Sequence, residues 1–522
     1  MSSGNSIRPA LYGAAMGWRL AARPAVSLGT LSWLLAALFL LHNTCPAEEP
    51  ALPPGLAEPS AGPESPPLPP GLESERDAGP ALPPGLGEGE PGLPAGLDDG
   101  DGPSLPPGLE GEEEEAPSAG EEPSLRDRLP IDFHGFLEVR GGVRTQRDYA
   151  QPADATIGEA RLQLETAKFW DKARLEVTTD FYLDGVLEEP VFDLRRFRLT
   201  WSPVSSVDVR VGRQVLTWGT GDLLFINDLF PKDWQSFFIG RDVEYLKAPS
   251  DAVKIGWFND VMNVEFVYTP QFDPDRFITG ERISFWNPIF GRHAGKRKTI
   301  DVNAPSTWFE DDEFALRLYR RFGAVEFAAY AYSGYWKSPG GQRLIPALQA
   351  SFPKLSVYGA SLRGTVGKGI GNIEFGYYDS RQDPGGDDPF INNSEFRLLI
   401  GYEQELAKEF TGAFQYYLEH MMDYSAYKNT RIVLVPQRDR DRHVFTVRLT
   451  KLLMNQNLTL SLFTYYSPSD GDAYLRPHLK YKASDRWTVE CGGNVFMGES
   501  DTSFFGQFEN NTNVYVGARY SF

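Results

Sequence analysis

The last ten residues, Asn-Val-Tyr-Val-Gly-Ala-Arg-Tyr-Ser-Phe at positions 513–522, decide the fold of this chain. Successive side chains of a β-strand point to opposite faces. One face of this segment would therefore carry Val514, Val516, Ala518, Tyr520 and Phe522, and the other Tyr515, Gly517, Arg519 and Ser521. An apolar face toward lipid and a mixed face toward a lumen is the pattern of a membrane β-barrel strand. An edge strand of a soluble sandwich is the alternative for this segment alone.

Composition agrees with a barrel. The chain has 522 residues and a mean hydropathy of −0.36, and beyond residue 50 no apolar run reaches the roughly 20 residues that a membrane helix needs. Aromatic residues make up 13% of the chain, which suits the aromatic girdles of a barrel. The two cysteines, Cys45 and Cys491, offer neither a disulfide framework nor a metal cluster. We expect no metal and no cofactor bound by this chain itself.

The first 130 residues predict two segments without a packed core. Three arginines precede the apolar stretch 31–41, so residues 1–47 are predicted to be a secretory signal peptide cleaved after Ala47. A retained membrane anchor is the alternative. Residues 48–130 are rich in Pro, Gly, Glu and Asp and are predicted to be a disordered periplasmic tail. Residues 1–130 hold 20 of the 71 acidic residues but only six of the 51 basic ones, so most of the negative charge belongs to this part.

A short unit repeats within the tail. Leu-Pro-Pro-Gly-Leu or a close variant occurs at 52–56, 68–72, 82–86, 93–97 and 105–109. An extended, self-repelling spacer is one interpretation. The other is avidity, in which several copies of one apolar motif dock on a periplasmic protein.

From residue 131 to 522 the sequence predicts an all-β transmembrane antiparallel barrel of about 18 strands, with 16 or 14 as alternatives. Tight turns are expected at 170–172, 203–206, 259–260, 322–323, 367–369, 407–408, 455–456 and 484–485. Longer connections alternate with them, which places all short turns on one rim and all long loops on the other. In an outer membrane this arrangement puts the tail and Phe522 in the periplasm. The weakest predicted strands are 355–366 and 475–482, the latter because Pro477 interrupts it.

The inward-facing positions carry many charges. Eleven arginines are predicted to line the pore: Arg140, Arg161, Arg174, Arg196, Arg198, Arg210, Arg317, Arg363, Arg397, Arg448 and Arg519. Nine glutamates are expected on the same face, so the lumen should be charged with arginine in modest excess. Such a lining implies water or dense ion pairing. We favour ion pairs between neighbouring strands for most of these arginines, and the remainder could guide an anion.

One connection is unusual. Residues 217–249 are too apolar for a water-exposed loop and too broken by Gly and Pro for a lipid-facing strand. Folding into the lumen resolves both objections, and such a loop would form a constriction. Its candidate residues are Trp218, Asp222, Asp228, Lys232 and Asp233. Capping of the barrel, or packing on a neighbouring protomer, is the alternative.

The same region carries a family resemblance. Val211-Gly212-Arg213-Gln214, then Trp218-Gly219, then Asn-Asp-Leu-Phe-Pro-Lys-Asp at 227–233, resembles the signature of alginate-export-type porins and porin-like proteins. The resemblance implies an eighteen-strand channel with an arginine-lined constriction. The proline-rich tail and the acidic lumen positions depart from that family's pattern, which puts a polysaccharide substrate in doubt.

A second resemblance lies at the C-terminus. Tyr520 and Phe522 resemble the terminal aromatic signal of bacterial outer-membrane proteins, which implies insertion by the outer-membrane assembly machinery.

The sequence therefore predicts a non-enzymatic outer-membrane channel for small, anionic, hydrophilic solutes, with lipid and lipopolysaccharide as surroundings and no nucleic-acid partner. Basic residues within 271–312 could contact lipopolysaccharide phosphates. Two alternatives remain. One is a barrel sheath or scaffold for a periplasmic partner such as a multihaem cytochrome, docked through the tail. The other is an outer-membrane hydrolase, although the six histidines lie in no recognisable catalytic spacing.

Overall fold

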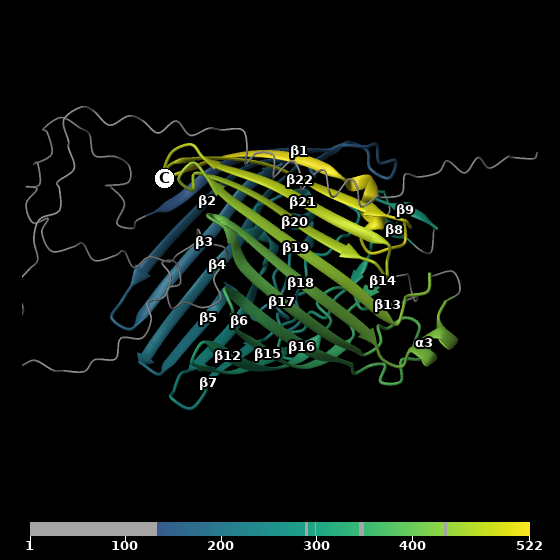
Figure 1. The fold of residues 1–522 in the computed structure, drawn as a ribbon, viewed down its shortest axis with the longest axis horizontal. Helices are drawn as coiled ribbons and strands as arrows, with labels where there is room; N and C mark the ends of the chain where they lie inside the picture. Colours follow the sequence, from purple (N-terminus) through teal and green to yellow (C-terminus); the bar gives the residue numbers. More distant parts are fainter. Residues whose placement is uncertain (1–132, 288–290, 298, 344–348, 433–435) are drawn as a thin grey trace, which may run out of the picture. The chain divides into compact units, whose positions relative to one another are not determined.

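The computed structural model describes residues 133–522 except 288–290, 298, 344–348 and 433–435. The predicted signal peptide and tail therefore lie outside the described residues. Eighteen strands form one closed antiparallel sheet, as the sequence predicts (Figure 1). They are β1 His134–Arg144, β2 Ala155–Phe169, β3 Ala173–Asp184, β4 Glu189–Val204, β5 Val207–Val215, β6 Pro249–Trp257, β7 Asn263–Thr269, β11 Glu313–Phe322, β12 Val325–Tyr335, β15 Lys354–Val366, β16 Gly369–Ser380, β17 Glu395–Ala407, β18 Phe410–Met421, β19 Asp441–Leu453, β20 Leu458–Ser467, β21 Asp472–Lys482, β22 Trp487–Gly498 and β23 Asn513–Ser521.

The C-terminal strand closes the barrel. β23 pairs antiparallel with β1 from Phe136↔Ser521 to Arg144↔Asn513, and with β22 on its other side. The terminal residue continues this ladder, because the Gly135 and Phe522 main chains exchange hydrogen bonds of 3.1 and 3.0 Å. Closure leaves the sheet without an edge strand.

The two rims differ as predicted. All eight predicted tight turns join consecutive strands at one rim, which also holds the start of β1 and the end of β23. In Figure 1 this rim lies on the left, at the C-terminus, and the long connections lie on the right with β8, β9 and α3. Two connections on the long-loop rim are short, 185–188 and 468–471. At the first, the Asp184 carboxylate accepts hydrogen bonds from the Val186 and Leu187 amides, which tightens the turn.

Small elements decorate the long connections. The strands are β8 Phe285–Asn287, β9 Arg292–Ala294, β10 Val302–Asn303, β13 Gly341–Arg343 and β14 Gln349–Ser351. The helices are α2 Trp234–Ile239, η1 Val243–Leu246, α3 Tyr424–Thr430 and η2 Gly506–Asn511. No helix within the described part of the chain has the length and apolar character needed to cross a membrane.

Alternation along the strands separates two environments. On β1, the outward Leu137 and Val139 are 51% and 67% exposed, whereas the inward Glu138 and Arg140 are buried. β23 repeats the pattern, with Val514 and Val516 exposed and Tyr515 buried. The barrel therefore has an apolar exterior and a polar interior wall.

The two strands with the weakest sequence patterns both form. β15 pairs along its length with β12 and β16. β21 keeps its register with β22 on both sides of Pro477, which itself has no amide to donate.

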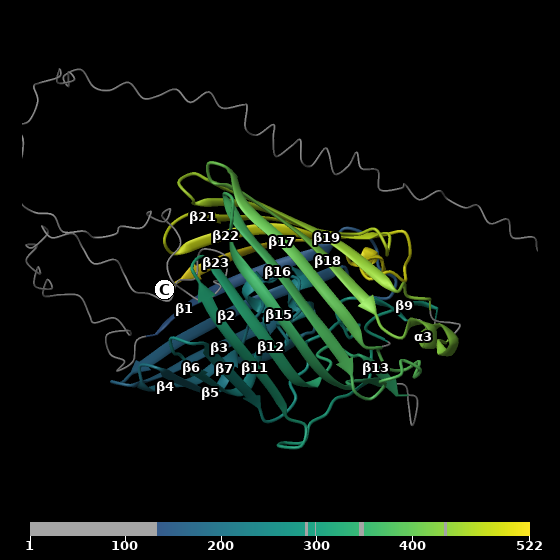
Figure 2. The ribbon, with the colours of Figure 1, turned by 60° about the horizontal axis from the view of Figure 1, so that its bottom comes forward.

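The main hydrophobic cluster lies inside the barrel. It joins the connection 216–248 to inward side chains on the long-loop half of the wall, among them Tyr330, Tyr474, Phe496 and Tyr515. Figure 2 shows the tilted strands surrounding these interior segments.

Candidate functional site

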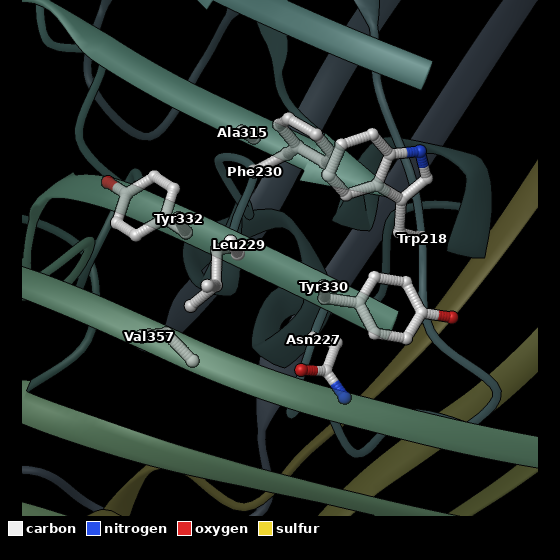
Figure 3. Close-up of a pocket in the computed structure, with 9 residues that line it drawn as sticks. Trp218, Asn227, Leu229, Phe230, Ala315, Tyr330, Tyr332 and Val357 are labelled. Atoms are coloured by element: carbon white, nitrogen blue, oxygen red, sulfur yellow. The ribbon is translucent and has the colours of Figure 1, made fainter. Parts of the chain in front are cut away.

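The connection between β5 and β6, residues 216–248, enters the lumen; we call it the lumen loop. Its first anchor is Trp218, whose Nε1 donates to Glu265 Oε2 on β7 at 2.9 Å. The Trp218 ring contacts Phe230 edge-on, with ring centres 5.0 Å apart. Figure 3 shows both rings with Leu229, Tyr330 and Val357 around a pocket between the loop and the strands β11, β12 and β15. Aromatic packing therefore fixes the loop to this side of the wall.

A single carboxylate on β16 holds the next part of the loop. Glu374 is 1% exposed. Its Oε2 accepts from the Thr220 amide at 2.7 Å and the Thr220 hydroxyl at 3.0 Å, and its Oε1 accepts from the Asn227 amide at 2.7 Å and side chain at 3.0 Å. The intervening turn needs Gly219. Its φ is +81°, and a Cβ added at this position would lie only 2.9 Å from the Glu374 carboxylate. Hydrogen bonds to an ionised acceptor are stronger than neutral ones, so Glu374 is a principal anchor.

The tip of this segment reaches three further strands. Arg448 on β19 binds Asp222 through two nitrogens, at 2.5 and 2.6 Å. Gln415 on β18 accepts from the Asp222 amide and donates to its carbonyl, at 2.7 and 2.8 Å. The Tyr465 hydroxyl on β20 donates to the Leu223 carbonyl at 2.6 Å.

Helix α2 turns the loop along the opposite wall. Asp233 caps its start by accepting from the Ser236 amide at 2.7 Å, and Gly240 ends it with φ +89°. A Cβ on Gly240 would lie 2.1 Å from the Tyr515 ring, so only glycine fits there. Phe238 packs against Phe496 and Phe508, with ring centres 5.2 and 5.3 Å away.

Charged groups secure the end of the loop to the first and last strands. Arg241 binds Glu159 on β2, and Arg140 on β1 donates to the Gly240 carbonyl at 2.7 Å. Arg519 on β23 binds Glu244 at 3.3 Å. Burial and the neighbouring Asp242 carboxylate raise the pKa of Glu244 to about 7, although Arg519 and Arg195 oppose this shift.

These bonds reach β1, β2, β7, β16, β18, β19, β20 and β23, so the loop crosses the lumen and is attached on opposite sides of the barrel. It spans 216–248 and so begins and ends one residue earlier than the predicted range 217–249. Three of its five candidate residues serve the loop's own fold. Asp228 pairs with Lys232 at 3.0 Å, and Asp233 is the helix cap, which also pairs with Arg276 of the connection 270–312 at 3.4 Å. Asp222 and Trp218 are the two that bind the wall.

Ten of the eleven arginines named from the sequence form ion pairs. The buried and half-buried pairs include Arg140 with Glu138 and Glu490, Arg161 with Glu159 and Asp180, Arg317 with Glu265 and Glu326, and Arg397 with Glu395 and Glu419. Arg519 binds Glu138 as well as the loop. Across the described residues, Arg363 forms no ion pair. Most of these arginines therefore join neighbouring strands or hold the loop.

Four of the arginines form a separate cluster on β3, β4 and β5, close to the short-turn rim. Arg174, Arg196 and Arg198 all pair with Glu176, and Arg210 pairs with Asp208. Their side chains remain 37%, 35%, 16% and 27% exposed, respectively. Three of these cations thus share the single Glu176 carboxylate. We call this cluster the basic mouth.

Sequence alternation missed an interior cation, Arg195, on β4. The pairing register between β3 and β4 shifts between Thr178 and Thr179, because a bulge on β4 inserts Arg195 as an extra residue. Arg195 is buried and donates to the loop carbonyls of Glu244 and Lys247 at 3.2 and 3.3 Å. A bulge changes which residues face inward, and strict alternation gives no sign of it.

The second long connection, 270–312, only partly matches its predicted role as a basic external loop. Arg282 is buried and binds Asp184. Arg292, Lys296 and Arg297 are exposed, whereas Lys298 lies outside the described residues.

No family model matches this chain, and no curated protein matches it. Among solved structures, it is similar to OccD3 (OpdP) of Pseudomonas aeruginosa, with a TM-score of 0.44 and 9% identity over 75% of this chain and 91% of that chain. OccAB3 of Acinetobacter baumannii has a TM-score of 0.44 and 10% identity over 75% of this chain and 99% of that one. An anion-selective porin from Comamonas acidovorans has a TM-score of 0.36 and 13% identity over 75% and 99%. These are likenesses of fold alone, and the function proposed below rests on the barrel's own geometry.

Proposed function

We propose that this protein is an outer-membrane channel for small, anionic, hydrophilic solutes, in which the lumen loop forms the constriction. The observation that carries the proposal is a closed barrel with an apolar exterior and a loop fixed across its charged lumen. An apolar outer band and a polar interior are the pattern of a transmembrane barrel. A loop bonded to opposite walls narrows the passage and sets which solutes pass.

The basic mouth supports the choice of anions. Three of its arginines share the Glu176 carboxylate, so a local positive charge remains there, and all four side chains are partly accessible. An arginine offers planar, multiple donors to carboxylate or phosphate groups. Most other lumen arginines are neutralised by carboxylates, so this cluster is the part of the lumen that we expect to attract an anion most strongly.

The test is single-channel recording of the full chain in planar bilayers, with reversal potentials measured under a salt gradient. We expect steady steps with anion preference, and Arg198→Gln or Arg210→Gln should lower that preference. Lys408→Gln is the matched control, because it removes one positive charge in the turn between β17 and β18 rather than in the basic mouth. A correctly inserted barrel that stays silent, or equal effects of all three variants, would contradict the proposal.

The sheath alternative is less compatible with this geometry, because an enclosed partner needs a wide lumen and the lumen loop occupies part of it. A hydrolase has no specific support from the geometry described above.

Membership of the alginate-export-type family remains a prediction based on the motif at 211–233. So does recognition of Tyr520 and Phe522 by the assembly machinery, and contact of the exposed basic residues with lipopolysaccharide.

The five tail repeats are proposed to bind a periplasmic protein. Pulldowns would compare the intact tail with one in which every flanking leucine is changed to serine. Recovery of the same proteins by both would contradict this idea.

A further inference from the structure

The surface of interest is the basic mouth, which has an excess of cations and faces the rim where the described chain begins. β1 starts at His134 on this rim, and the four arginines lie on β3, β4 and β5, two to four strands along the same wall. The outer two, Arg174 and Arg210, both pair in register with Thr200 and so lie nearer the rim than Arg198 and Arg196; they are 37% and 27% exposed. An anionic group arriving from this rim would therefore meet them first.

The chain itself carries a strongly anionic segment next to this rim in sequence. Residues 110–122 contain Glu110, Glu112, Glu113, Glu114, Glu115, Glu121 and Glu122 and no basic residue. The segment ends eleven residues before Phe133, the first described residue. At up to about 3.3–3.6 Å per residue, eleven residues reach roughly 35–40 Å.

That reach is sufficient. Neighbouring strands are about 4.8 Å apart and tilt by roughly 40°, so β4 lies roughly 20 Å from β1 along the wall. Tethering also converts binding into an intramolecular event, for which short linkers give effective concentrations of about millimolar. Even a modest attraction between glutamates and arginines is then sufficient for occupancy.

We propose that the acidic segment 110–122 docks on the basic mouth of its own barrel. The contact joins glutamate carboxylates to the guanidinium groups of Arg174, Arg196, Arg198 and Arg210 in partly exposed surroundings, so salt screens it. Docking does not depend on conduction. Its consequence, competition between the segment and anionic solutes, rests on the proposed function.

The test is the rate of disulfide formation under a fixed concentration of a soluble oxidant, in the full chain with Cys45 and Cys491 changed to serine. Ala116→Cys is placed in the acidic segment, and Ser202→Cys beside the basic mouth, where Ser202 donates to Asp208 at 3.0 Å. The matched control replaces Ser202→Cys with Lys408→Cys, in the turn between β17 and β18, half the eighteen-strand ring away. Residue 116 can reach both sites, because seventeen residues span up to roughly 60 Å and the ring is roughly 35 Å across.

At low ionic strength, the disulfide between positions 116 and 202 should form at least about ten times faster than that between 116 and 408. The ratio should fall at about 0.5 M salt, where screening acts within about 4 Å, to the smaller preference for the nearer position 202 that tether length alone gives. It should also fall when the seven glutamates become glutamine, or in the double variant Arg174→Gln with Arg196→Gln, which leaves Arg198 to pair with Glu176. Equal rates at low salt, or a ratio that the seven glutamine substitutions leave unchanged, would overturn the proposal.

The outcome is separable from that of the channel experiment. A silent barrel with a strong preference for position 202 would keep the docking and remove the proposed function. A selective channel with equal crosslinking rates would keep the proposed function and remove the docking.

Discussion

Replacement of Glu374 by glutamine should release the lumen loop without unfolding the barrel. The carboxylate accepts four hydrogen bonds, two from Thr220 and two from Asn227. Glutamine keeps one acceptor oxygen but turns an NH₂ group toward two donors. Two of the four bonds are lost, at about 1.5–3 kcal/mol each for a charged partner, or about 3–6 kcal/mol in total.

The assay is amide hydrogen exchange of the segment containing Thr220 and Asn227, measured by mass spectrometry on the refolded protein. A factor of ten corresponds to about 1.4 kcal/mol, so protection in this segment should fall by about 10²–10⁴. Strand amides of the barrel should be unaffected, because their ladder does not involve this side chain. In channel recordings the current through the open channel should become noisier, because the released loop moves within the lumen.

Glu403→Gln is the matched control, since it neutralises a glutamate on the neighbouring strand β17 that is exposed rather than buried. Unchanged protection at Thr220 and Asn227 in Glu374→Gln, or an equal loss in the control, would refute the assignment of Glu374 as the anchor.

Three further outcomes are expected. Gly240→Ala should destabilise the loop by about 2–4 kcal/mol, because a left-handed backbone and overpacking against Tyr515 act together; Gly141→Ala, where a Cβ meets nothing within 4 Å, should leave the thermal midpoint unchanged. In the folded protein the pKa of Glu244 is raised to about 7, so the protonated form of this carboxyl stabilises the docked loop. This contribution is fully present below the ordinary pKa of glutamate and is lost as pH rises through about 7. Amide exchange of residues 242–247, corrected for intrinsic rate, should change over that pH window and should lose this pH dependence in Glu244→Gln. Phe522→Ala should lower the amount of barrel in the outer membrane while refolding in detergent stays normal, because the terminal pairing with Gly135 uses main-chain atoms; equal yields in both settings would contradict a role as an assembly signal.

Local patterns were sufficient to predict the barrel. Alternation with period two depends only on neighbouring residues, and glycine, asparagine and aspartate mark turns through their own backbone preferences. The count of about eighteen strands and all eight tight turns follow from that information together with closure. Even the unusual loop was visible, because its apolar composition fits neither water nor lipid.

The partners of each charge depended on tertiary structure. Asp222 and Arg448 are separated by 226 positions, and nothing in either segment indicates that they meet. Arg195 entered the lumen through a bulge, and a one-residue slip changes the face of every following side chain. The sequence by itself determined which barrel strands and tight turns form and which face of most strands is charged, since these are local properties. Only the closed ring decided which charges are neutralised and which, as in the basic mouth, stay in excess, because ion pairing depends on distances that closure and loop docking create.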